Sequence, residues 1–115
     1  MKDNVIVNKS FDFAIKIIHV YKLLSGDKKE YVLSKQLLRS GTSIGANIEE
    51  AVGGISKKDF IAKLQISYKE CRETIYWIRL LSSTGYITET TGDELRKDAG
   101  EIIRIIVAIL KSSKK

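Results

Sequence analysis

The side chains that could perform chemistry in this sequence are few and far apart. There is one histidine, His19, and one cysteine, Cys71, in 115 residues. A zinc site draws its ligands largely from these residue types. A di-metal site in a helical bundle needs Glu-x-x-His pairs on two helices, whereas Lys16 stands three residues before His19. The sequence therefore predicts neither a metal nor a cofactor.

The paired glutamates and the single cysteine thiol do not indicate catalysis either. Glu49-Glu50 and Glu70/Glu73 could supply general acids and bases, but Arg39 and Arg72 are close enough along the chain to neutralise them. Cys71 lies on the apolar side of its helix and is interpreted as an inert core thiol. No strand is predicted, so no glycine-rich phosphate loop can follow one. We expect a protein that is not an enzyme.

Cations recur at helical spacing in the second half of the chain. Successive residues of a helix are about 100° apart around its axis. On this basis four cations lie with Tyr76 on the outward side of the third predicted helix, and three lie on the outward side of the fourth. They are Lys58, Lys69, Arg72 and Arg79 with Tyr76, and then Lys97, Arg104 and Lys111. With a formal net charge of +6, these residues are interpreted as phosphate contacts, with Tyr76 available for base stacking. The alternative is an ordinary solvated face.

These side chains must be positioned by helices. The chain has no proline, and apolar residues recur every three or four positions. Four helices are predicted, over about 8–24, 30–52, 57–82 and 88–111. Asn8 or Ser10 is expected to cap the first, Gly53-Gly54 to end the second in a left-handed turn, and Ser56 to cap the third. Short connections predict one all-α domain over 1–115, an antiparallel up-down-up-down four-helix bundle.

The first helix has two apolar stripes where a bundle needs one. Phe11, Ala14, Ile15, Ile18 and Tyr21 form the first stripe; Phe13, Ile17, Val20 and Leu24 form the second. A surplus apolar stripe usually marks a protein interface, so we expect a homo-oligomer. The interface is assigned to Phe13, Ile17 and Val20, although the sequence leaves open which stripe faces the core.

Small and polar residues interrupt the second helix. Gly41 and Gly45 each cost about 1 kcal/mol relative to alanine in a helix interior, which indicates tight contact on that side with another helix or a neighbouring subunit. Gln36 and Asn47 need hydrogen-bond partners if they are buried. We interpret the stretch as a packed interhelical seam with a polar network. A small-molecule pocket beside Asn47 is the alternative, and no motif supports it.

The same stretch carries a family pattern. "QLLRSGTSIGANIEEA" (36–51) resembles the motif Q-L-x-R-S-x-x-S-I-x-x-N-I-x-E-G of small four-helix-bundle proteins encoded by intervening sequences within bacterial 23S ribosomal RNA genes. The polar positions that match are Gln36, Arg39, Ser40, Ser43, Asn47 and Glu50. Ala51 stands where glycine is usual. The segment from Asp59 to Leu81 is similar to the family's third helix.

The resemblance implies a ring-shaped homo-oligomer, for which we expect five subunits, and it carries over no catalytic residues. The family also contains the accessory variability determinant of diversity-generating retroelements, a basic ring that binds nucleic acid and a reverse transcriptase. We therefore expect a nucleic-acid-binding homo-oligomer, for RNA or DNA, with a scaffold that docks another protein as the alternative. The N-terminal stretch lacks the apolar core of a signal peptide and no membrane span is predicted, so a cytoplasmic location is expected.

Overall fold

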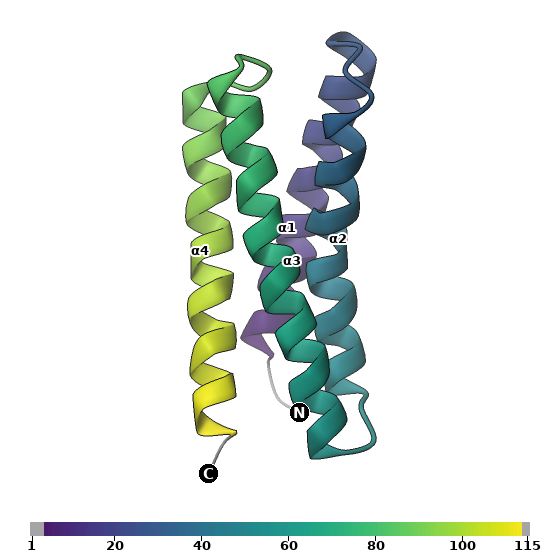
Figure 1. Cartoon of the computed structure of the whole chain (residues 1–115), viewed down its shortest axis with the longest axis vertical. Helices are drawn as coiled ribbons and strands as arrows, with labels where there is room; N and C mark the ends of the chain where they lie inside the picture. The colour runs from purple at the N-terminus through teal and green to yellow at the C-terminus, as the bar shows by residue number, and fades with distance from the viewer. Residues whose placement is uncertain (1–3, 114–115) are drawn as a thin grey trace.

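Four long helices lie side by side in the computed structural model, which describes residues 4–113 (Figure 1). They are α1 (Val5–Lys22), α2 (Leu33–Val52), α3 (Lys57–Ser83) and α4 (Glu89–Ser112), and a π-helical turn, η1 (Leu23–Asp27), continues α1. Each helix packs against the next along the chain, and α4 also contacts α1. The predicted all-α, antiparallel up-down-up-down bundle is confirmed, with extents of 46 × 22 × 20 Å.

The first helix begins earlier than the sequence pattern predicts. Asn4 is its N-cap, since the Asn4 side-chain oxygen accepts a hydrogen bond from the backbone N–H of Val7 at 3.3 Å. Ile6 is buried against the core. The start predicted at Asn8 or Ser10 is therefore wrong, because burial of this additional apolar turn extends the helix towards the N-terminus.

The second helix begins later than predicted, at Leu33, because the chain turns sharply before it. Lys29 has a positive φ of 54°. The carboxylate of Glu30 then accepts hydrogen bonds from the backbone N–H groups of Leu33 (3.1 Å) and Ser34 (2.7 Å). Burial acts to raise the pKa of Glu30, but these backbone donors outweigh it and hold the pKa below its usual value. Val32 occupies the N-cap position, and the Glu30 carboxylate satisfies the first backbone N–H groups of α2 in place of an N-cap side chain.

Hydroxyl caps open the last two helices. Ser56 accepts from the backbone N–H of Asp59 at 3.0 Å, as predicted, and Thr88 accepts from that of Thr91 at 3.1 Å. Gly53 follows the last residue of α2 with φ −84°, so the predicted left-handed turn does not form there. The left-handed glycine is Gly85 (φ 82°), in the connection between α3 and α4.

The core runs along the bundle axis and receives one stripe from each helix. Phe13 and Ile17 of α1 are 2% and 0% exposed, and Val20 packs against the same core. The assignment of Phe13 and Ile17 to an oligomer interface is therefore wrong, because the other helices of the protomer already cover them. Val20 is partly buried, and its assignment to the interface stays a prediction. Within residues 4–113, none of the helices has an apolar stretch that could cross a lipid bilayer.

Candidate functional site

The outward stripe of α3 lies on the surface as the sequence predicts. Its four cations and its tyrosine are all exposed; they are Lys58, Lys69, Arg72, Tyr76 and Arg79. Arg72 is held in place by Tyr68 one turn earlier: the guanidinium carbon is 6.0 Å from the ring centroid, and Nη1 donates to the phenolic oxygen at 3.4 Å. A cation over an aromatic ring in this geometry is attracted by the ring's electron density, so part of the stripe is ordered before any partner binds.

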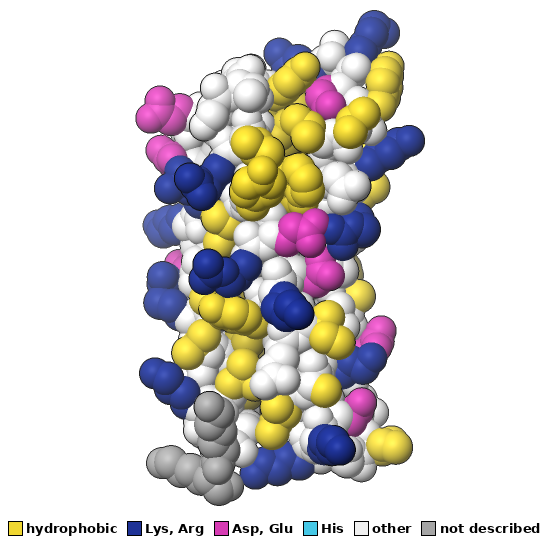
Figure 2. Space-filling model, in the orientation of Figure 1, with side chains coloured by type: hydrophobic (Ala, Val, Ile, Leu, Met, Phe, Trp, Pro, Cys, Tyr) yellow, Lys and Arg dark blue, Asp and Glu magenta, His cyan; other side chains and the backbone are white. Residues whose placement is uncertain are grey.

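The predicted α4 cations also lie on the surface, on the helix that follows α3. Lys97, Arg104 and Lys111 are exposed, and α4 packs along α3. Figure 2 shows Lys and Arg side chains spaced along the α4 edge and across the middle of α3. The seven cations of the two helices, together with Tyr76, are called the α3/α4 basic face below.

The cations of this face take no part in the ion pairs that join the helices. The salt bridges between described residues join α1 to α4, α2 to α3, and Arg96 to Asp93 within α4. None of the seven cations of the α3/α4 basic face takes part in them. No salt bridge between described residues occupies these cations, and exposed cations without ion-pair partners can attract a polyanion.

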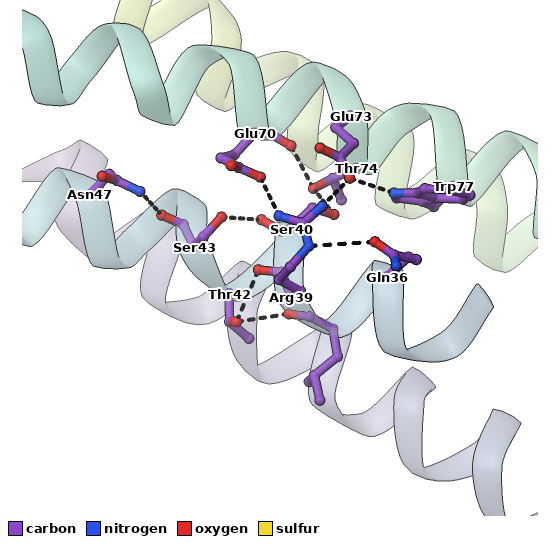
Figure 3. A network of polar contacts seen from close by, with 11 residues as sticks. Gln36, Arg39, Ser40, Thr42, Ser43, Asn47, Glu70, Glu73, Thr74 and Trp77 are labelled. Carbon is purple, nitrogen blue, oxygen red and sulfur yellow. Dashed lines mark hydrogen bonds and ion pairs between the residues drawn. The ribbon is translucent and has the colours of Figure 1, made fainter. Parts of the chain in front are cut away.

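The motif residues lie at the seam between α2 and α3, where a polar network joins the two helices (Figure 3). Arg39 of α2 forms ion pairs with Glu70 and Glu73 of α3. The indole N–H of Trp77 donates to the Glu73 carboxylate at 2.9 Å. The sequence placed Arg39 near these carboxylates, whereas Trp77 was missed. Its spacing of four residues from Glu73 is the signal that could have revealed it.

Hydroxyl groups fill the buried part of the same seam. Ser40 Oγ and Thr74 Oγ1 lie 2.8 Å apart, and the Thr74 hydroxyl is 2.7 Å from the Glu70 carbonyl. The Ser67 hydroxyl donates to the carbonyl of Ile44 across the seam at 2.9 Å. Small hydroxyl side chains permit the two backbones to approach while leaving each polar atom paired.

The remaining motif residues lie toward the edge of the seam. The Ser43 hydroxyl donates to the carbonyl of Ser40, and the Asn47 amide donates to the carbonyl of Ser43 at 2.8 Å. Gln36 accepts from Arg39 at 3.4 Å, and Glu50 pairs with Lys63 of α3 at 2.9 Å. The Asn47 amide thus donates within its own helix.

The glycines of α2 explain the close approach of α1. A Cβ atom added to Gly41 would lie 2.8 Å from both Cγ atoms of Ile17, and one added to Gly45 would lie 3.3 Å from the Ser10 hydroxyl. The tight contact predicted at these glycines is therefore made with α1 of the same protomer.

The other apolar stripe of α1 is the exposed one. Phe11 is 61% exposed and Ile15 is 40% exposed, and Ile18 lies on the same side. Phe11 and Ala14 line a hollow with Ala46 of α2. The surplus apolar surface that the sequence predicts therefore exists, but on Phe11, Ile15 and Ile18.

The thiol and the imidazole considered for catalysis lie in different environments. Cys71 is buried, its thiol faces the carbonyl of Ala99 at 3.4 Å, and burial raises its pKa to about 12. His19 is exposed on α1. Among residues 4–113, no group of three His, Cys, Asp or Glu side chains is arranged to hold a metal ion.

Comparison with known proteins places the chain in a family. Residues 2–108 match the family model described as 23S rRNA-intervening sequence protein. The chain is also similar to a protein of unknown function from the S23 ribosomal protein family of Bacteroides thetaiotaomicron VPI-5482, known from a crystal structure. Identity is 50%, the match covers 96% of this chain and 99% of that chain, and the TM-score is 0.93. No curated protein matches. The family model matches nearly the whole chain, and the solved structure has the same fold at 50% identity. The chain therefore belongs to the 23S rRNA-intervening sequence protein family.

Proposed function

We propose that this protein is a non-catalytic homo-oligomer that binds RNA or DNA through the α3/α4 basic face. The observation that carries the proposal is the placement of seven exposed cations, none of them in a salt bridge between described residues, on two adjacent helices. The family that the sequence resembles also contains the nucleic-acid-binding accessory variability determinant of diversity-generating retroelements, which supports the same function.

The expected mode of binding is contact with the phosphate backbone. Lysine and arginine side chains that neutralise phosphates release condensed counterions, which drives binding with little dependence on sequence. In a homo-oligomer each subunit repeats the face, so weak contacts combine through effective concentration into stronger binding.

Self-association is assigned to the exposed stripe of α1, and the resemblance implies a ring of five subunits. Phe11, Ile15 and Ile18 are large apolar side chains left in water in the protomer, and contact with a second copy would remove them from it. Native mass spectrometry of the unmodified protein should show no dominant monomer.

Substitution at the two stripes of α1 gives a matched comparison. Phe11→Asp with Ile15→Asp should dissociate the oligomer while helix content persists. Phe13→Asp with Ile17→Asp should instead unfold the protomer, because these residues are 2% and 0% exposed. A monomer of the unmodified chain at micromolar concentration would refute self-association.

Charge reversal tests the nucleic-acid interface. Lys69→Glu, Arg72→Glu and Arg79→Glu, combined in one variant, should abolish binding to mixed-sequence RNA and DNA in fluorescence anisotropy. A control variant with Lys22→Glu, Lys28→Glu and Lys35→Glu carries the same net charge but alters exposed lysines outside the face. It should retain most of the binding. Helix content and oligomer mass are checked for both variants.

The salt dependence of binding is the second measurement. The logarithm of the binding constant should fall linearly with the logarithm of salt concentration over about 50–200 mM, with a slope near −0.7 to −0.9 per phosphate contacted. Absence of binding by the unmodified protein at low salt would refute the proposal. The apolar stripe of α1 would then favour the alternative, an oligomeric scaffold that docks another protein.

A further inference from the structure

Within the α3/α4 basic face there is a hollow whose lining differs from that of a simple phosphate-binding strip. It has a volume of about 360 Å³ and is lined by Arg72, Ile75, Tyr76 and Arg79 of α3 and by Ile103 of α4. Its volume falls at the lower end of the range for small-molecule sites. Two apolar side chains, one aromatic ring and two guanidinium groups thus share a single concave surface.

We propose that this hollow receives one unpaired nucleobase, and hence that the protein prefers single-stranded to double-stranded nucleic acid. The inference rests on the nucleic-acid binding proposed above and specifies which form is bound. A base in a duplex has its faces covered by its neighbours and cannot enter, whereas a base in a single strand can be splayed out onto an aromatic side chain.

Tyr76 is suited to provide the stacking surface. It is 51% exposed, and its ring meets the neighbouring Trp77 ring edge-on, with centroids 5.1 Å apart and an interplanar angle of 67°. Trp77 is itself fixed by its hydrogen bond to Glu73. The tyrosine ring is therefore supported from one side by a positioned indole and remains available to a ligand.

The two arginines supply the polar part of the site. Arg72 and Arg79 stand four residues before and three residues after Tyr76, so all three share one side of α3. Arg72 is oriented by Tyr68. A base stacked on Tyr76 would place the phosphates on either side of its nucleotide within the field of these guanidinium groups, while Ile75 and Ile103 contact the apolar part of the base.

Paired binding measurements test the preference. The probes are an oligonucleotide of mixed sequence without self-complementarity and the duplex formed with its complement, at one salt concentration. The unmodified protein should bind the single strand more tightly. Tyr76→Leu should weaken single-strand binding about tenfold, within the range for loss of one base–aromatic stack, and leave duplex binding unchanged. Tyr76→Phe should bind as the unmodified protein does.

Two controls separate a local effect from a general one. Tyr31→Leu removes a tyrosine of similar exposure, 53%, outside the face and should have no effect. Trp77 is the single tryptophan of the chain and adjoins Tyr76. Single-stranded DNA should therefore quench its fluorescence saturably, and Tyr76→Leu should reduce the quenching at equal occupancy.

The outcomes distinguish this inference from the function on which it rests. Salt-dependent binding with equal affinity for both forms, unaffected by Tyr76→Leu, would overturn the base-binding hollow and leave the phosphate-binding face intact. No binding of either form would overturn both.

Discussion

Replacing Gly41 with alanine should destabilise the protein, although alanine is the better helix former. Glycine in a helix interior costs about 1 kcal/mol relative to alanine, so the change by itself would stabilise α2. However, the added Cβ would lie 2.8 Å from both Cγ atoms of Ile17, whose side chain is fully buried. Overpacking of a core costs about 1–3 kcal/mol. The expected net result is a loss of about 1 kcal/mol in the free energy of unfolding.

Gly100→Ala is the matched control, because Gly100 also lies within a helix but has space beside it. The nearest atom to a Cβ added there is Arg104 Nη1, at 3.7 Å. Only the gain in helix propensity applies, so this variant should be stabilised by up to about 1 kcal/mol. If the free energy of unfolding falls for Gly41→Ala and rises for Gly100→Ala, the effect of interhelical packing is separated from that of helix propensity.

The assay is urea unfolding followed by far-ultraviolet circular dichroism at one fixed protein concentration, since association couples to stability. Ile17→Ala completes a double-mutant cycle. By itself Ile17→Ala should lower the free energy of unfolding by about 2–5 kcal/mol. Because it removes both Cγ atoms, Gly41→Ala made in the Ile17→Ala protein should be neutral or stabilising. If Gly41→Ala raised the urea midpoint as Gly100→Ala does, the close approach of α1 to α2 would be refuted.

Other substitutions test the seam and the helix cap. Thr74→Val should cost about 1–3 kcal/mol in urea unfolding, because it leaves the buried hydroxyl of Ser40 without its partner; combining it with Ser40→Ala should cost less than the sum of the two. Arg39→Ala should cost no more than about 1 kcal/mol, because half of that side chain is exposed to solvent, and the cost should shrink as salt is added. Glu30→Gln should cost about 1 kcal/mol near neutral pH. Since the pKa of Glu30 is lowered by folding, the stabilisation is present above its ordinary pKa of about 4.5, and the difference between the variants should disappear as pH falls below that value. Cys71, with its pKa raised to about 12 by burial, should react with a thiol reagent at pH 8 only after urea unfolds the chain.

The four helices and most of their ends could be predicted from local patterns in the sequence. Apolar periodicity, the absence of proline and the hydroxyl of Ser56 are local features, and local features control where a helix forms and begins. The start of α1 was misplaced because burial of Ile6, a tertiary contact, extends it. The outward direction of the α3 and α4 cations also followed from the sequence, because side chains that share a face do so by helix geometry alone.

The rotation of each helix about its axis, and the choice of its neighbours, could not be predicted in this way because they depend on packing between helices. The two apolar stripes of α1 are similar in character, and the absence of side chains at Gly41 and Gly45 lets α2 approach the side that carries Ile17 and Ser10. That packing buries Phe13 and leaves Phe11 in water. Likewise, Ile103 joins Tyr76 in one hollow because α4 packs along α3. Helical periodicity describes a single helix about its own axis, whereas the neighbour of each face is set by which pairs of surfaces pack most closely.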